Sequence, residues 1–263
     1  MLQEYKGKTV VIKYGGAAMQ SEELKAGVME DVAMLAADAD VILVHGGGPE
    51  LSALQKKLGS EPLFVDGLRY TDEETMDAAL MALCGKVNKE LVKLLENLGR
   101  KAVGISGIDG GILRCEKQRE PDIGFVGEVS DVDTGLLLTL LGAGYTPIVS
   151  TVGLGGDGHA YNINADTAAG KIAASVKADL YITMTDVPGV LKDADLIAEI
   201  KTGEVEELIA EGVITGGMIP KARGIADIVA KGAGSAYIID GRVPHALLAF
   251  MNGEMTGTRF TNG

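Results

Sequence analysis

Tryptophan is missing from the 263-residue chain, which also has only two cysteines and three histidines. Cys84 and Cys115 form no C-x-x-C pair and have no neighbouring histidine, which argues against zinc binding, thiol catalysis and a disulfide-stapled fold. Basic residues are outnumbered, because 24 Lys and Arg face 37 Asp and Glu, for a net charge of −13. Such a balance argues against nucleic acid or an anionic membrane surface as a partner, and we expect neither.

Long apolar segments are also scarce. Residues 1–6 lack the apolar stretch of a signal peptide, so we expect a cytoplasmic protein. Residues 135–156 carry no charged side chain and are long enough to cross a bilayer. Gly142, Gly144 and Pro147 interrupt this segment, which favours a helix, a turn and a strand over one membrane span.

What the chain has in excess is glycine, with 37 residues or about twice the ordinary usage. Short apolar runs bounded by glycine alternate with segments of helical period, which predicts an α/β fold: a three-layer αβα sandwich around a mainly parallel central sheet. We predict strands at 9–13, 41–44, 102–105, 147–151, 180–184 and 236–239, and helices at 21–37, 71–98, 165–176 and 218–231.

The helix at 71–98 should begin with a capping box at Thr71 and end at Gly99. Segments 124–131 and 153–164 have the pattern of hairpin insertions. No linker or repeat divides the chain, and 175–179 is the best candidate for a boundary between two lobes. We therefore expect an N-terminal lobe at 1–176 and a C-terminal lobe at 177–263 that share one continuous sheet.

Two glycine loops directly follow predicted strands, one after Lys13 at 15–16 and one at 46–48 before Pro49. Ligands bind at the carboxyl ends of parallel strands, where consecutive glycine N–H groups and a helix N-terminus favour an anion. Tight turns alone would also use glycine, but three in a row before a proline cost more backbone entropy than a turn requires. An anion site is therefore the favoured interpretation.

Generic nucleotide motifs do not fit the chain. The pattern G-x-x-x-x-G-K-[ST] does not occur, which excludes a P-loop NTPase. Residues 153–158 match G-x-G-x-x-G, but a strand-like segment follows them where a dinucleotide-binding loop would open a helix.

Three charged residues are candidates for phosphate chemistry. Lys13 lies next to the first glycine loop, and Lys221 lies at a helix start, where a cation is unfavourable unless an anion balances it. Asp166 lies in the first turn of a helix, where an acid is also expected simply as a partner of the helix dipole. Asn162 and Asn164 precede that helix and offer side-chain amides to a ligand, although capping would use one of them.

Taken together, these motifs resemble the amino acid kinase family over nearly the whole chain, and within it the members that phosphorylate N-acetyl-L-glutamate. The motifs occur in family order at 13–19, 44–49, 66–69, 104–110, 162–166, 185–190 and 216–221.

The resemblance implies transfer of a phosphoryl group from ATP to the side-chain carboxylate of N-acetyl-L-glutamate, which gives an acyl phosphate and ADP in arginine biosynthesis. It implies that Lys13 binds the moving phosphoryl group, that Lys221 approaches the bridging oxygen and that Asp166 holds both lysines. Magnesium would be held mainly by ATP phosphates and water, and no protein ligand to a metal is expected. The implied substrate residues are Gly16, Gly47, Gly48, Arg69 (for the α-carboxylate) and Asn162. The implied nucleotide residues are Thr185, Asp186, Val187, Pro188, Gly189, Val190, Leu191, Val213, Ile214 and Thr215.

Few residues precede Lys13, whereas the arginine-inhibited relatives resemble a longer design with an extra helix that links dimers into a hexamer. We therefore expect a homodimer with its interface in the N-terminal lobe and without arginine feedback. The same fold would also suit a kinase for another carboxylate acceptor, such as carrier-bound aminoadipate. A non-catalytic nucleotide or amino-acid sensor is the alternative from a different class.

Overall fold

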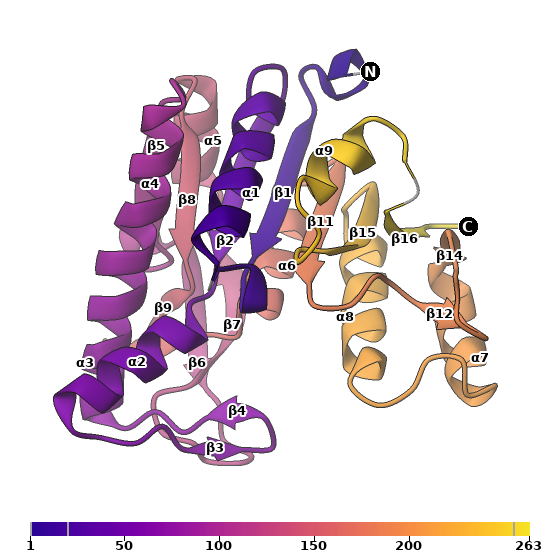
Figure 1. The fold of residues 1–263 in the computed structure, drawn as a ribbon. Helices are drawn as coiled ribbons and strands as arrows, with labels where there is room; N and C mark the ends of the chain where they lie inside the picture. Colours follow the sequence, from indigo (N-terminus) through magenta and orange to yellow (C-terminus); the bar gives the residue numbers. More distant parts are fainter. Residues whose placement is uncertain (1, 20, 255) are drawn as a thin grey trace.

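An eight-stranded sheet runs through the molecule in the order β14-β16-β15-β11-β1-β2-β8-β5 (Figure 1). The computed structural model describes residues 2–19, 21–254 and 256–263, and the side chains of residues 2, 3, 17 and 18 are not described. The strands of the sheet are β1 (Thr9–Tyr14), β2 (Asp40–His45), β5 (Ala102–Ser106), β8 (Thr146–Ser150), β11 (Leu180–Thr185), β14 (Glu199–Lys201), β15 (Ser235–Asp240) and β16 (Gly257–Thr261).

The six predicted strands are all confirmed, and they form the parallel part of the sheet from β15 to β5. β16 pairs antiparallel with β15 and parallel with β14, so these two strands run against the others. The sheet is therefore mainly parallel, as predicted.

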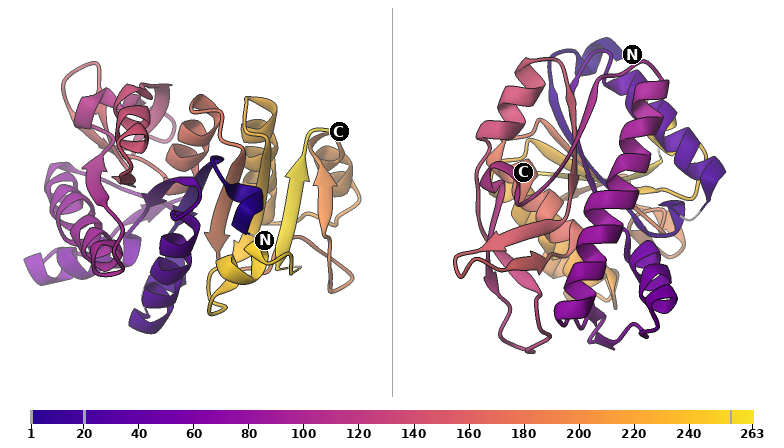
Figure 2. Two further views of the ribbon diagram at one scale, coloured as in Figure 1. Left: turned by 90° about the horizontal axis from the view of Figure 1, so that it is seen from above. Right: turned by 90° about the vertical axis from the view of Figure 1, so that its left-hand side faces the viewer.

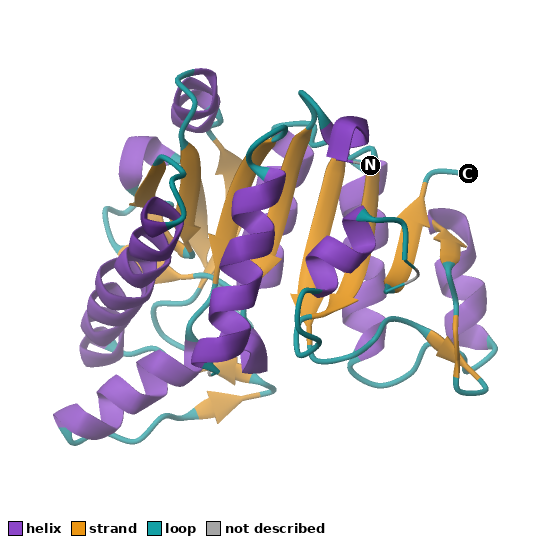
Figure 3. Cartoon of the chain, turned by 45° about the horizontal axis from the view of Figure 1, so that its top comes forward, coloured by secondary structure: helices purple, strands orange, loops and turns teal. Residues whose placement is uncertain are grey.

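Helices cover both faces of the sheet (Figures 2 and 3). One layer contains α1 (Glu22–Leu35), α4 (Asn88–Asn97) and α9 (Ala246–Met251). The other contains α5 (Gly135–Gly142), α6 (Ala165–Ser175), α7 (Val205–Ala210) and α8 (Met218–Ala230). The predicted three-layer arrangement is confirmed, and so are the helices predicted at 21–37, 165–176 and 218–231.

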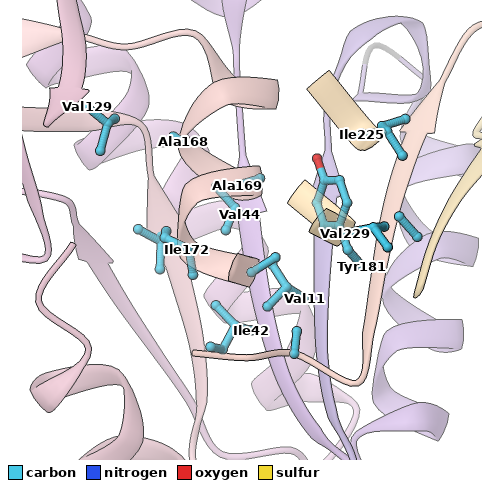
Figure 4. Close-up of a cluster of buried hydrophobic side chains, with 14 of the residues drawn as sticks. Val11, Ile42, Val44, Val129, Ala168, Ala169, Ile172, Tyr181, Ile225 and Val229 are labelled. Atoms are coloured by element: carbon cyan, nitrogen blue, oxygen red, sulfur yellow. The ribbon is translucent and has the colours of Figure 1, made fainter. Parts of the chain in front are cut away.

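Side-chain alternation along the strands divides the core between these two layers. In β1, Val10 and Ile12 pack with α1, α4 and α9, while Val11 packs with α6 and α8. Figure 4 shows Val11 beside Ile172 of α6, with Tyr181 of β11 toward α8. Each of the two cores contains residues from both sides of position 176, so the sheet and its two cores are continuous along the chain.

A smaller module lies below the main sheet and surrounds the glycine loops. It contains the sheet β10-β9-β6-β7, the hairpin β3–β4 and a third core shared by α2, α3 and the helix that follows. Its elements are α2 (Gly48–Leu58), β3 (Phe64–Val65), β4 (Leu68–Arg69), α3 (Glu73–Ala79), β6 (Leu113–Lys117), β7 (Gly127–Val132), β9 (Val152–Gly155) and β10 (Ala160–Asn162).

Two local predictions in this module need correction. Segment 153–164 does form the hairpin β9–β10, but segment 124–131 is only one arm of a pairing whose other arm, β6, was not predicted. The helix predicted from Thr71 has Asp72 as its N-cap, whose carboxylate accepts a hydrogen bond from Thr75 N–H. Thr71 is instead fully buried and donates to the Arg69 carbonyl.

The long helix after Asp72 is not a regular α-helix. Between α3 and α4 it passes through a π-helical segment, η3 (Leu80–Val87), and it ends at Gly99 with φ of 78°. The remaining short elements are η1 (Leu2–Tyr5), η2 (Gly16–Met19), η4 (Asp109–Gly111), β12 (Leu191–Lys192), β13 (Asp195–Leu196) and η5 (Thr202–Glu204). Among the described residues, no helix is both long and apolar enough to cross a bilayer.

Candidate functional site

The predicted charged residues converge at the carboxyl ends of β1 and β11. Lys13 follows Val11 by two residues, so its side chain lies on the α6 face of the sheet, beside Thr183 in the paired strand. Lys13 Nζ lies 3.1 Å from Asp166 Oδ1, and Thr183 Oγ1 donates to the same oxygen at 3.1 Å. The lysine side chain is 10% exposed and the Asp166 side chain 44%, so the pair sits at the floor of an accessible site.

The carboxylate of Asp166 is set between two cations. Partial burial alone would raise the pKa of Asp166, but the charges of Lys13 and Lys221, with hydrogen bonds from Lys13 and Thr183, hold it below its ordinary value. Asp166 is therefore ionised at neutral pH and offsets part of the repulsion between the two lysines.

Asp166 was predicted to hold both lysines, but in the structure the direct partner of Lys221 is Thr185. Its Nζ donates to Thr185 Oγ1 at 2.8 Å, and that hydroxyl donates to Asp186 Oδ1 at 3.2 Å. Burial lowers the pKa of Lys221, Asp166 opposes that shift, and the positive charge of Lys13 lowers the pKa further. Asp166 thus contacts Lys13 directly and acts on Lys221 through its charge.

A cavity of about 600 Å³ opens beside this cluster, between α6 and α8 and under β7. Asp166, Thr183 and Lys221 lie in its lining, together with Asn164 and Gly217. Its volume falls in the range of small-molecule and cofactor sites.

A second cavity, of about 200 Å³, adjoins the first one, because Leu68, Val126 and Asn164 line both. The glycine loop forms one wall and the β3–β4 hairpin another. Four of the predicted substrate residues line it: Gly47, Gly48, Arg69 and Asn162. Gly16, the fifth, begins η2 with φ of 72° and lines neither of the two cavities.

The first turns of α2 fix the guanidinium of Arg69. Its Nη1 donates to Gln55 Oε1 at 2.6 Å, and its Nη2 donates to the Gly48 carbonyl at 2.9 Å and to Ser52 Oγ at 2.7 Å. The Phe64 ring lies 4.8 Å from the guanidinium carbon. Three of the five N–H donors of Arg69 are used within the described part of the protein, and Arg69 lines the smaller cavity.

The predicted nucleotide segments lie after β11 and before α8. Val190 and Ile214 are each 1% exposed and pack into the main core, and their backbone N–H groups donate to Thr258 Oγ1 and to the Leu208 carbonyl. Asp186, Pro188, Leu191 and Thr215 are exposed, and Thr185 contacts Lys221. None of the predicted nucleotide residues lines the two cavities described above.

Several residues that shape the site were missed by the sequence analysis. Thr183 is a polar residue in an apolar strand, and strand alternation places it on the same face as Tyr181, which is a signal that was available. Gln55 and Thr71 gave no such signal. They were found only because the fold brings them to Arg69 and to Asn162, whose Nδ2 donates to Thr71 Oγ1 at 3.3 Å.

The sequence model of the amino acid kinase family matches residues 8–240. The chain belongs to the amino acid kinase family. It is 51% identical to the acetylglutamate kinase of Brachyspira hyodysenteriae, over 98% of this chain and 92% of the relative. It is 49% identical to the acetylglutamate kinase of Clostridium kluyveri, over 94% of this chain and 89% of the relative.

Solved structures share the fold of this chain. The crystal structure of smu.665 from Streptococcus mutans has a TM-score of 0.76 and 29% identity, over 97% of this chain and 99% of that one. The N-acetylglutamate synthase of Neisseria gonorrhoeae, complexed with coenzyme A and N-acetyl-glutamate, has a TM-score of 0.85 at 21% identity. The match covers 100% of this chain and 61% of the synthase. At 21% identity, the similarity shows a shared fold only.

Proposed function

We propose that this protein is an acetylglutamate kinase, which transfers the terminal phosphoryl group of ATP to the side-chain carboxylate of N-acetyl-L-glutamate in arginine biosynthesis. The products are an acyl phosphate and ADP. The observation that carries the proposal is the 49–51% identity with acetylglutamate kinases over 94–98% of this chain. The cluster of Lys13, Asp166 and Lys221, beside the larger of the two adjoining cavities, supports it.

Phosphoryl transfer needs positioning and charge stabilisation rather than a covalent intermediate. A carboxylate acceptor is ionised at neutral pH and attacks without a general base. Lys13 approaches the migrating group from the strand side, and Lys221 stabilises the charge that develops on the oxygen leaving with ADP. Asp166 is a positioning residue, since it holds Lys13 directly and moderates the repulsion between the lysines.

In this proposal, each lobe binds one of the two substrates. N-acetyl-L-glutamate binds in the smaller cavity of the lobe at 1–176, where Arg69 offers its remaining N–H donors to the α-carboxylate and Asn162 contacts the other α-substituents. Gly16, Gly47 and Gly48 supply N–H groups to the transferred phosphoryl group and to the acceptor oxygens. ATP binds to the lobe at 177–263, along 185–191 and 213–215, with its phosphates reaching toward Lys221.

Magnesium fits this arrangement as a partner of the nucleotide. Within the described residues, no three His, Cys, Asp or Glu side chains gather in a way that would hold a metal ion. In this proposal a Mg²⁺ ion takes its ligands mainly from ATP phosphates and water, where it neutralises phosphate charge.

The proposal is tested by trapping the acyl phosphate as a hydroxamate with four acceptors: N-acetylglutamate, glutamate, aspartate and N-acetylaspartate. We expect ATP- and magnesium-dependent product with N-acetylglutamate only. Product with a different acceptor would overturn the substrate assignment but keep the chemistry. A chain that binds ATP and forms no hydroxamate with any of the four would contradict the proposal.

We also propose that the chain forms a homodimer through the lobe at 1–176. Exposed apolar side chains lie on elements near β5, the edge strand of the main sheet: Met81, Leu98, Leu138 and Tyr145. Sedimentation velocity should show a species of twice the 27.3 kDa chain mass, unchanged by arginine. A monomer at micromolar concentration, or a hexamer, would contradict this assignment.

A further inference from the structure

The glycine loop at 46–48 rests on a buried histidine. His45, the last residue of β2, is 0% exposed. Its Nδ1 lies 2.7 Å from the Gly46 carbonyl oxygen, and its Nε2 lies 3.1 Å from Nδ2 of Asn88, the first residue of α4. The imidazole therefore joins the loop to α4, a helix of the layer that also contains α1 and α9.

The partners of Asn88 fix the orientation of its amide. Asn88 is also 0% exposed. Its Nδ2 donates to the carbonyls of Ile148 at 2.9 Å and Ile105 at 3.2 Å, while its Oδ1 accepts from Lys89 Nζ at 3.0 Å. Because carbonyls only accept and an ammonium only donates, Nδ2 must lie on the side of the two carbonyls and His45, where three acceptors share its two N–H groups.

The two neighbours of the ring decide the tautomer of the imidazole. Nδ1 faces the Gly46 carbonyl, which only accepts, and must carry the proton. Nε2 faces an amide nitrogen, which does not accept, so a proton on Nε2 would have no acceptor there and Nε2 carries a lone pair. His45 is thus neutral and protonated on Nδ1. In agreement, burial lowers its pKa to about 4. Since both ring nitrogens are occupied and buried, His45 is not available as an acid or base for the substrates.

The hydrogen bond from His45 controls the direction of one peptide group. A trans peptide is planar, so the Gly46 carbonyl and the Gly47 N–H point in opposite directions. The carbonyl points at the buried ring, and the N–H therefore points away from it. Gly47 lines the smaller cavity, and within the described part of the chain no protein group accepts a hydrogen bond from its N–H.

The other side of the loop is held by packing. Gly47 has φ of 152°, which favours glycine. A Cβ at Gly47 would lie 2.7 Å from Leu83 Cδ2 and 3.3 Å from Val87 Cγ2. Both of these side chains belong to the π-helical segment η3 that directly precedes Asn88, so one irregular helix supplies both the packing and the polar anchor. Such π-helical segments are frequent at functional sites.

We propose that His45, anchored by Asn88, is a positioning residue that turns the Gly46–Gly47 peptide so that the Gly47 N–H donates to the transferred phosphoryl group. The effect of this peptide orientation on catalysis rests on the proposed kinase function. The tautomer and the peptide orientation follow from the hydrogen bonds alone, which allows the two claims to be tested separately.

The first test is a long-range ¹H–¹⁵N NMR spectrum of the ¹⁵N-histidine-labelled protein at neutral pH. The chain has only three histidines, so His45 can be assigned by comparison with His159→Gln and His245→Asn. We expect a protonated Nδ1 and an unprotonated Nε2 for His45. An Nε2-protonated or doubly protonated ring would overturn the proposal, whether or not the chain is a kinase.

The second test separates positioning from packing by comparing His45→Asn with His45→Phe. The Asn amide nitrogen reaches the place of Nδ1 and can still donate to the Gly46 carbonyl, whereas Phe cannot. If one transition-state hydrogen bond is lost, we expect His45→Phe to lower kcat about 100-fold with KM for ATP unchanged. His45→Asn should retain most of kcat.

The control is Ile42→Ala, in the same strand and equally buried, which should lower the thermal stability and leave kcat unchanged. The proposal is overturned if His45→Phe keeps wild-type kcat, or if His45→Asn and His45→Phe lose kcat equally. Should His45→Phe fail to fold, the NMR result and the kcat of His45→Asn still decide the question.

Discussion

At the scale of single residues, Gly104 in β5 packs directly against Asn88, which occupies the space that a Cβ at position 104 would need. A Cβ at Gly104 would overlap the Asn88 side-chain oxygen and lie 2.7 Å from Lys89 Nζ. Asn88 is held by several hydrogen bonds and cannot move freely. We expect Gly104→Ala to lower the free energy of unfolding by about 1–3 kcal/mol in urea titrations, as overpacking does.

Gly142 offers the matched control for this substitution. It is the last residue of α5, and a Cβ there would meet no heavy atom within 4 Å. Because alanine loses less backbone entropy than glycine in a helix, Gly142→Ala should be neutral or stabilise by up to about 1 kcal/mol. Equal effects of the two substitutions would contradict the packing assigned to Gly104.

Residue-level predictions from the sequence succeeded where local position was enough. Lys13 was placed by the end of a strand and Asp166 by the first turn of a helix, and the fold brings these two ends together. The sequence did not reveal that Lys221 is held by Thr185. It also did not reveal the pair of His45 and Asn88, which are 43 positions apart and owe their burial to the packing of separate elements.

At the scale of elements, a histidine joins the segment before α9 to α1. His245 Nδ1 lies 2.7 Å from Asp31 Oδ1, and Asp31 also accepts from Leu248 N–H at 3.1 Å. The hydrogen bond and charge of Asp31 raise the pKa of His245, with a smaller contribution from Glu30 at 3.9 Å. Burial raises the pKa of Asp31 because it outweighs the hydrogen bonds that the carboxylate receives.

A raised pKa of His245 means that protonation stabilises the folded state. That contribution is fully present below the ordinary histidine pKa of about 6.5 and is lost as the pH rises through the folded-state pKa. His245→Asn keeps a hydrogen-bond donor and tolerates the φ of 54° at this position, but it does not titrate. The Tm advantage of wild type over His245→Asn should therefore shrink from about pH 6 to about pH 9. A constant difference across that range would contradict this reading.

Elements were predictable from the sequence where their pattern was local and strong. The six parallel strands are short and each contains Val or Ile, and all except the edge strand β5 are almost entirely buried, as parallel strands are. Strands of two or three residues, such as β12 and β14, have too little pattern to be recognised and depend on pairing partners. The π-helical segment at 80–87 was not predictable either, because its sequence has ordinary helical composition, and its packing beside Gly47 arises only in the folded chain.

At the scale of the whole molecule, the two proposed lobes are joined through their cores. β1 pairs with β11 across the boundary at 176, and each large core draws side chains from both lobes. We expect one cooperative thermal transition in calorimetry, with equal van't Hoff and calorimetric enthalpies. Two separate transitions, or independent folding of a 177–263 fragment, would contradict a continuous core.

Lys13 and Lys221 are proposed above all to stabilise the phosphoryl group as it passes from ATP to the acceptor carboxylate. The most direct test is the kcat for N-acetylglutamyl phosphate formation by Lys13→Met and Lys221→Met, with ATP affinity measured in parallel and Lys56→Met on α2 as a surface control. We predict that each site variant lowers kcat by about 10²–10³-fold, in the range found for lost transition-state donors, while Lys56→Met matches wild type. Wild-type kcat in either site variant, in the presence of normal ATP binding, would contradict the account.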